Sequence, residues 1–359
     1  MNSNSIFFKL LQAAVSDATI GTLPKEEWEE CYELAIGHGL QSFLFPVAQK
    51  FLRDEDGNRI EPLFRQWLAD IVQTDERNKI LNEKAKFLTR YFRERNYKTC
   101  VLKGQGVARL YPMPELRQCG DIDIWVDGKQ DAIISCLMDN CIGLRHIDYV
   151  HSEAAFFDDA EVEVHFRPSW MYNPIKNYRL QKFFSENAKE QFEKVDVEMG
   201  FAYPTIKFNL VYSLIHINRH IFEEGIGLRQ LLDYYYILNH STKNERDKAY
   251  SILCKLGLKK FVGAIMYVES KVFNLSKEKM LCLPNDKEGE FLLEEIMRGG
   301  NFGRYDNRNQ WYAKESRLKR GLFHLKRNLR YLRHYPSEVL WMPFWSVWHW
   351  CWRKWKGYL

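Results

Sequence analysis

Two aspartates in one short alternating segment constrain the fold of this chain more than any other feature. In "CGDIDIWVD" (residues 119–127), Asp121 and Asp123 alternate with Ile122 and Ile124. This alternation predicts a β-strand in which both carboxylates project from the same face. Like charges repel, and a carboxylate beside a core is rarely left without a partner. The fold must therefore supply a partner on that face.

A divalent cation is one such partner. Mg²⁺ commonly takes one or two protein carboxylates together with substrate phosphates. A further acid, Glu163, lies in a segment where Glu161, Glu163 and His165 alternate with apolar residues. We favour Glu163 as the third ligand because it lies two residues from His165, with Glu161 as the alternative. A polar strand face that binds no metal is the competing interpretation.

Helical patterns flank the segment that contains these acids. Helices are expected within residues 1–21, 24–52 and 62–95, and again within 206–222, 227–240 and 243–257, since apolar residues recur there near helical spacing. Strands are expected at 97–104 and 121–127, with a hairpin over 154–168 that turns at Asp158-Asp159 and short helices at 105–112 and 129–140. We therefore predict an α+β fold with three regions: N-terminal helices (1–96), a small mixed β-sheet core (97–203) and C-terminal helices (204–359).

Composition narrows the class of protein. The 359 residues carry a net charge of +5, which permits a polyanionic partner without arguing for one. The eight cysteines show no zinc-binding spacing, and scattered thiols are typical of a reducing compartment. No apolar run approaches the roughly 20 residues of a spanning helix. We therefore expect a soluble, cytoplasmic protein.

Upstream of the acids, "VLKG" is predicted to end a strand and begin a helix, which would present backbone N–H groups to a phosphate. This order of motifs resembles the nucleotidyltransferase superfamily that includes DNA polymerase beta, the poly(A) polymerases and the antibiotic nucleotidyltransferases. More closely, "LKGQGVARLYPMPELRQCGDIDIWV" followed by "VEVHFRP" resembles a bacterial family of uncharacterised nucleotidyltransferases. "HINRHIFEEGIGLRQLLD" (216–233) is similar to the C-terminal helical part of that family.

The resemblance implies a Mg²⁺-dependent transfer of a nucleoside monophosphate from an NTP to an acceptor, with release of pyrophosphate. By resemblance, Asp121, Asp123 and Glu163 are the catalytic residues and hold two Mg²⁺ ions, with Mn²⁺ as the alternative metal. The superfamily usually has Gly-Ser after the first strand. Here that position reads Lys-Gly-Gln, so phosphate contacts fall to backbone N–H groups or to basic side chains. The substrate-binding candidates are Lys103, Gly104, Gln105, Arg117, Gly120 and His165.

Other functions stay open at this point. A glycosyltransferase also uses Asp-x-Asp to hold a metal on a nucleotide diphosphate, although it needs a nucleotide-sugar domain ahead of the motif. A non-catalytic nucleotide-binding or regulatory module could keep the same fold. The acceptor is unidentified, and a small molecule, a glycan precursor, a protein and RNA are all compatible with the sequence.

Several features of the C-terminal half have structural alternatives. His216 and His220 are spaced i, i+4 without a third zinc ligand, so packing or a hydrogen bond, for example to Asp233, is favoured over a metal. Arg219, Arg229 and His220 are candidates to border the acceptor cleft. The Gly-rich loop 298–309 is expected to be a connection rather than a phosphate site.

The chain ends with a basic helix and a tryptophan-rich segment. Leu318, Leu322, Leu325, Leu329 and Leu332 form one stripe of the expected basic helix. In the tail, Trp345, Trp348, Trp352 and Trp355 are spaced 3, 4 and 3, as on one face of a helix. Docking of this face onto the body of the protein is the default. A dimer contact and a peripheral membrane contact are the alternatives.

Overall fold

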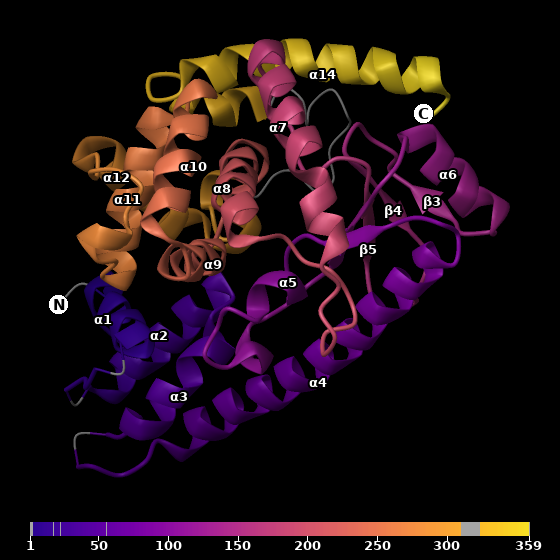
Figure 1. Ribbon diagram of the computed structural model, residues 1–359. Helices are drawn as coiled ribbons and strands as arrows, with labels where there is room; N and C mark the ends of the chain where they lie inside the picture. Colours follow the sequence, from indigo (N-terminus) through magenta and orange to yellow (C-terminus); the bar gives the residue numbers. More distant parts are fainter. Residues whose placement is uncertain (1–2, 17, 22, 55, 310–323, 359) are drawn as a thin grey trace.

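The computed structural model describes residues 3–16, 18–21, 23–54, 56–309 and 324–358, and it confirms the predicted α+β class (Figure 1). One mixed sheet is surrounded by helices. The helices are α1 (Ser3–Ser16), α2 (Lys25–His38), α3 (Gln41–Phe51), α4 (Glu61–Arg93), α5 (Gln105–Ala108), α6 (Gln130–Asp139), α7 (Pro174–Glu193), α8 (Ile206–Glu223), α9 (Leu228–Asn239), α10 (Lys243–Lys255), α11 (Lys259–Phe273), α12 (Asp286–Gly299) and α14 (Pro336–Lys356).

Five strands form the sheet in the order β1-β2-β5-β4-β3. They are β1 (Thr99–Val101), β2 (Ile122–Val126), β3 (Leu144–Arg145), β4 (His151–Ala154) and β5 (Val162–His165). The central pair, β2 and β5, is parallel, whereas the other neighbouring pairs are antiparallel. In this pair Asp123 lies opposite Glu163, and Trp125 lies opposite His165. Because side chains alternate between the two faces of a strand, these four residues share one face of the sheet.

One face of the sheet is apolar and is covered by α4 and α6. The strands contribute Ile122, Ile124, Val126, Val162 and Val164 to this cluster. From α4 come Leu81, Ala85, Leu88 and Phe92, at spacings of 4, 3 and 4 that keep them on one side of the helix. Figure 1 shows α4 running from the N-terminal helices to the far end of the sheet. The predicted helix 62–95 is thus confirmed, and it supplies part of the core beneath the sheet.

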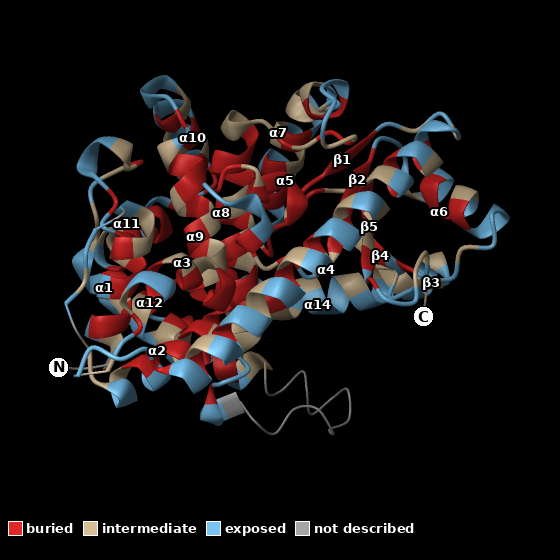
Figure 2. Cartoon of the chain, turned by 90° about the horizontal axis from the view of Figure 1, so that it is seen from below, coloured by how far each residue is buried: buried red, intermediate tan, exposed pale blue. Residues whose placement is uncertain are grey.

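The opposite face of the sheet carries a packed aromatic side chain beside two acidic ones. Trp125 lies on it and packs against Phe192 of α7 and Phe208 of α8, with ring centroids 4.5 and 5.9 Å away. Asp123 and Glu163 share this face. Helices α8, α9 and α11 are buried along most of their length (Figure 2), and with α1–α3 they belong to the larger hydrophobic core of the protein. The acidic face therefore opens toward the helical half of the molecule.

Helix α14 docks one face on the body of the protein, as expected for the tryptophan-rich tail. Tyr149 contacts the rings of Trp345, Trp348 and Trp352, with centroids 5.4, 5.5 and 6.1 Å away. At the end of the helix, Lys356 pairs with Asp131 of α6 at 2.7 Å. Trp355 is an exception to the predicted stripe, because it is 79% exposed. Among the described residues, no helix is long and apolar enough to cross a membrane.

Three local expectations differ from the structure. The first strand of the predicted hairpin is β4, which ends at Ala154, so Phe156 and Phe157 lie in the connection and pack against the α4 cluster instead. Helix α7 lies where no helix was expected, since its apolar residues are sparse. The first part of the predicted basic helix, with Leu318 and Leu322, lies outside the described residues, and Leu329 is exposed.

Candidate active-site cleft

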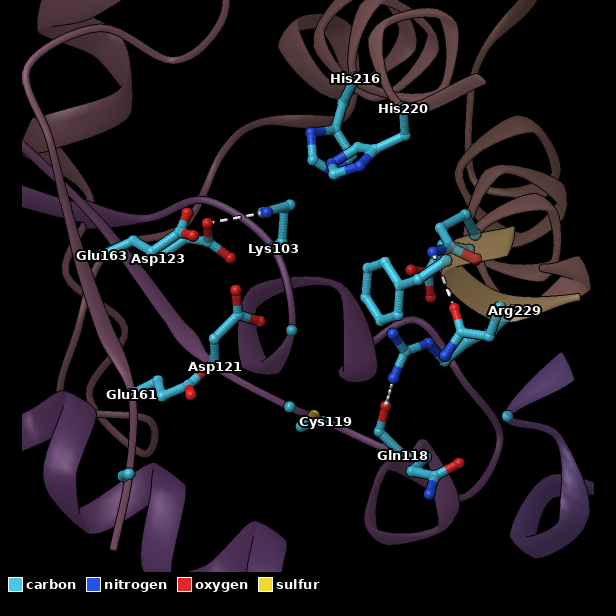
Figure 3. Close-up of a pocket in the computed structure, with 18 of the residues that line it drawn as sticks. Lys103, Gln118, Cys119, Asp121, Asp123, Glu161, Glu163, His216, His220 and Arg229 are labelled. Atoms are coloured by element: carbon cyan, nitrogen blue, oxygen red, sulfur yellow. Dashed lines mark hydrogen bonds and ion pairs between the residues drawn. The ribbon is translucent and has the colours of Figure 1, made fainter. Parts of the chain in front are cut away.

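The three predicted acids meet at the ends of two neighbouring strands. Asp121 immediately precedes β2, Asp123 lies within it, and Glu163 occupies the matching position of β5. One carboxylate oxygen from each lies within 4.8 Å of the others (Figure 3). Three hard oxygen ligands at this spacing fit a divalent cation such as Mg²⁺. The alternative acid, Glu161, also lines the cleft but does not belong to this group.

Asp123 is the most enclosed of the three acids, and two cationic side chains contact it. It is 2% exposed. Its Oδ1 atom lies 2.7 Å from Lys103 Nζ and 2.9 Å from His165 Nε2. Burial alone would lower the pKa of Lys103, but the charges of Asp123 and Asp121 outweigh it and raise that pKa above its usual value. Lys103 is therefore held in its charged form beside the acids.

His165 is a buried cation between two carboxylates. Its Nε2 atom lies near Asp123 and also 3.2 Å from Glu163 Oε2. Burial opposes its charge, but these two hydrogen bonds raise the pKa of His165 to about 9. The pKa of Glu163 moves the other way: burial raises it, yet the hydrogen bond from His165 and the charge of His151 leave it below its ordinary value. The site thus balances three acids against neighbouring cations.

The acids line a large cleft with a volume of about 1220 Å³. Its walls come from all three regions of the chain: the α2–α3 junction around Gly39, the sheet with its connections, and helices α8 and α9 with the loop that follows α12. This space is large enough for a nucleotide together with part of a second substrate.

Arg117 is fixed in the cleft wall by α9. Its guanidinium forms a two-pronged contact with Asp233, with Nε 2.8 Å from Oδ1 and Nη2 2.7 Å from Oδ2. The Tyr111 hydroxyl donates a third hydrogen bond to Asp233 at 2.6 Å. Burial disfavours the charge, but Asp233 overrides it and raises the pKa of Arg117 above its usual value. Because Asp233 compensates its charge, Arg117 connects the loop before β2 to α9 at the cleft wall.

The remaining substrate-binding candidates fall in two groups. Gly104 and Gly120 line the cleft, and Gly104 has φ of +50°, a backbone conformation that favours glycine. Gln105 and His165 are each 1% exposed and are not among the residues that line it. The turn after β1 also uses its own amides, since Gly106 N–H donates to the Lys103 carbonyl oxygen. Direct contact of the Gln105 side chain with substrate is therefore not supported by its position.

Histidines and arginines of α8 and α9 form part of the cleft wall. Residues His216, Arg219, His220 and Arg229 all line the cleft (Figure 3 labels three of them). The expected hydrogen bond from His220 to Asp233 is wrong, because His220 Nδ1 instead donates to Glu224 at 2.9 Å, while Asp233 is engaged by Arg117. His216 and His220 pack ring against ring, with centroids 4.2 Å apart, as the packing interpretation predicted.

Sequence reasoning missed the contribution of β4. His151 and Glu153 of this strand pair with His165 and Glu163 of β5 in antiparallel register. The signal was present: His-x-Glu in one strand of the hairpin mirrors Glu-x-His in the other. It was not used because the first strand was expected a few residues later. The Gly-rich loop 298–309 was expected to be a connection only, yet Asn301, Phe302, Arg304 and Tyr305 of this loop line the cleft. The lining residues of the α2–α3 junction had no local signal, since only the tertiary fold brings them to the cleft.

Comparison with known proteins gives one family. A family model described as uncharacterised nucleotidyltransferase matches residues 24–274, which include α4, the sheet, the three acids and the helices that face them. No curated protein and no solved structure matches the chain.

Proposed function

The chain belongs to the uncharacterised nucleotidyltransferase family, a family of enzymes that transfer a phosphorus-containing group. From this premise, we propose that it moves a nucleoside monophosphate from an NTP to an acceptor in the cleft above β2 and β5. The observation that carries the proposal is the meeting of Asp121, Asp123 and Glu163 at the wall of this cleft. We also propose that the fold belongs to the superfamily of DNA polymerase beta and that the chain is of bacterial type.

Each side chain has a role in this proposal. Asp121, Asp123 and Glu163 hold the cations, two Mg²⁺ ions or Mn²⁺ in their place. When bound, these ions would neutralise the triphosphate and stabilise the attacking and leaving oxygens. Lys103 lies beside Asp123 and offers its ammonium group to phosphate oxygens, while Arg117, paired with Asp233, supports the cleft wall beside them.

The proposed reaction is an in-line displacement at the α-phosphorus. An acceptor oxygen forms the new bond, the bond to the β-phosphate oxygen breaks, and pyrophosphate leaves. The Nε2 atom of His165 lies 2.9 Å from Asp123 and 3.2 Å from Glu163, so this buried ring fixes where the two carboxylates lie. Gly104 allows the backbone to turn sharply between β1 and α5, because its φ of +50° is a conformation that other residues adopt only at a cost.

The alternatives differ in what they require of the chain. A glycosyltransferase needs a nucleotide-sugar domain ahead of the Asp-x-Asp strand, and in the described residues that part of the chain contains helices α1–α5 and only one short strand, β1. A non-catalytic nucleotide-binding module needs only the cleft. The acceptor, whether a small molecule, a glycan precursor, a protein or RNA, follows from none of these contacts.

All eight cysteines are unpaired, which favours the reducing cytoplasm as the location.

Nucleotide binding by calorimetry tests the proposal. We expect the four NTPs with Mg²⁺ to include at least one ligand, and UDP-sugars to bind more weakly. Asp121→Asn and Asp123→Asn should reduce binding of the Mg²⁺–NTP complex by at least about tenfold, since each removes one charged ligand. Asp158→Asn is the matched control, because Asp158 lines the cleft but is exposed and outside the acidic group. If no NTP binds, or if all three variants bind equally, the proposal fails.

A further inference from the structure

A second group of side chains, richer in nitrogen, adjoins the acidic group. His151 of β4 lies directly opposite His165 of β5 in the antiparallel pair, and Glu163 lies two residues before His165 on the same face of β5. One ligand atom from each of these three residues lies within 4.8 Å of the others. The His151 Nε2 atom is 3.7 Å from Glu163 Oε1, and His165 Nε2 is 3.2 Å from Glu163 Oε2. Each imidazole thus approaches a different oxygen of one carboxylate.

The hydrogen bonds of His165 determine which of its nitrogens faces this group. Its Nδ1 atom lies 3.1 Å from the Arg167 carbonyl oxygen, which can only accept, so Nδ1 must carry a proton. The Nε2 atom faces Asp123 and Glu163, which also only accept. This position therefore requires a positive charge on Nε2: either a second proton or a bound metal ion. An Nδ1–H bonded to a backbone carbonyl is the arrangement that orients a metal-ligating histidine.

His151 offers a second nitrogen at the same place. Its side chain is 16% exposed, and its Nδ1 atom has no hydrogen-bond partner within the described part of the chain. Its Nε2 atom points between Glu163 and Asp148, which is 4.0 Å away. His151 plays no part in the roles proposed above for the acids.

We propose that His151, Glu163 and His165 form a cation position with two imidazole ligands, which selects a divalent transition-metal ion, with Mn²⁺ as its probe, over Mg²⁺. Imidazole nitrogen suits transition metals, whereas Mg²⁺ prefers a complete set of oxygen ligands. Glu163 belongs to both groups, so this position adjoins the acidic one. The inference deepens the proposed function by assigning the metal class, but binding of metal alone tests it without any nucleotide.

The experiment uses the full chain without NTP. Mn²⁺ is titrated and followed by electron paramagnetic resonance, and electron spin-echo modulation then detects nitrogen nuclei bonded directly to the ion. We expect couplings to ¹⁴N from imidazole, and we expect an equal concentration of Mg²⁺ to leave them in place. His151→Asn should weaken Mn²⁺ binding by at least about tenfold, the lower end of what loss of supporting contacts already costs. His146→Asn is the matched control, since His146 is exposed and asparagine tolerates its φ of +48°.

The results separate this inference from the proposed function. Mn²⁺ bound without ¹⁴N coupling in the unaltered protein, or displaced by equimolar Mg²⁺, would overturn the inference, and so would equal affinity in the two histidine variants. Even if His151→Asn does not fold, the spectrum of the unaltered protein still shows whether imidazole nitrogen is bonded to the ion. If ¹⁴N coupling is present but no NTP binds, the metal position stands and only nucleotidyl transfer fails.

Discussion

Gly104 occupies a backbone conformation that other residues adopt only at a cost. Its φ and ψ are +50° and −110°, between the end of β1 and the start of α5. An added Cβ would meet only the Asp121 carbonyl oxygen, at 3.6 Å, which is ordinary contact. The strain of a substitution would therefore come from the dihedral angles and not from crowding.

We predict that Gly104→Ala lowers the free energy of unfolding by about 1–2 kcal/mol, the usual cost of a side chain in such a conformation. Urea denaturation measures it. Gly120→Ala is the control, because nothing lies within 4 Å of its added Cβ and its φ is not in the left-handed region, so a change within about 0.5 kcal/mol is expected. Equal effects of the two substitutions would show that the turn at Gly104 is not strained as described.

Glu223 is an acid whose environment opposes its charge. It lies at the end of α8, and burial raises its pKa to about 7 even though Arg219 Nε is 3.4 Å away. In the unfolded chain a glutamate titrates near pH 4.3. Between these two values the folded state binds more protons than the unfolded state, so the free energy of unfolding falls as pH rises through this window.

Glu223→Gln removes that dependence. The free energy of unfolding of the variant, relative to that of the unaltered protein, should therefore increase as the pH is raised from 5 to 8. Urea midpoints of both proteins at these two pH values provide the measurement. A difference in unfolding free energy that stays constant with pH, or that turns in favour of the unaltered protein at pH 8, would contradict the raised pKa of Glu223.

At the scale of elements, the buried Arg117–Asp233 pair joins the loop before β2 to α9. Their side chains are 6% and 14% exposed. Removing one partner of such a pair leaves an uncompensated buried charge, which typically costs 3–5 kcal/mol. The pair thus links the sheet to the C-terminal helices at the wall of the cleft.

We predict that Asp233→Asn lowers the free energy of unfolding by about 3 kcal/mol or more. Asp247→Asn, which breaks the exposed pair with Lys243, should cost less than about 1 kcal/mol. The double variant Arg117→Met/Asp233→Asn should recover part of the loss, because it no longer buries an unpaired charge. If Asp233→Asn costs no more than Asp247→Asn, the pair does not stabilise this junction.

Individual elements differed in how well the sequence predicted them. β2 was predictable because its alternation is local: Asp121 and Asp123 alternate with Ile122 and Ile124, which lie in the core on the opposite face. Helix α4 was predictable because its apolar residues keep helical spacing without a glycine or proline after its first turn. Helix α7 has few apolar residues and was missed. β4 was placed a few residues late, because "AAFF" is the more apolar part of that segment, although Phe156 and Phe157 serve the core and not the strand.

At the scale of the whole molecule, the cleft depends on parts of the chain that are far apart in sequence. The three acids and Lys103 were predictable, since they lie within about 60 residues and follow a recognisable order. The partner of Arg117 was not, because a contact across more than 100 residues is decided by packing. The partner of His220 had a local signal, since His220 and Glu224 are spaced i, i+4. The domain boundaries at residues 96 and 203 remain our proposal. Helix α4 lies before residue 96, yet it contributes residues both to the larger helical core and to the cluster beneath the sheet.

Transfer of label from NTPs tests the central claim most directly. The purified protein is incubated with a divalent cation, a cell extract as the source of acceptor, and each NTP labelled with ³²P at either the α- or the γ-phosphate. We predict that an acceptor becomes labelled from at least one α-labelled NTP and from no γ-labelled NTP, and that Asp121→Asn abolishes this labelling while Asp158→Asn does not. Labelling from the γ-phosphate, or labelling that is unchanged in Asp121→Asn, would contradict nucleotidyl transfer at the acidic group.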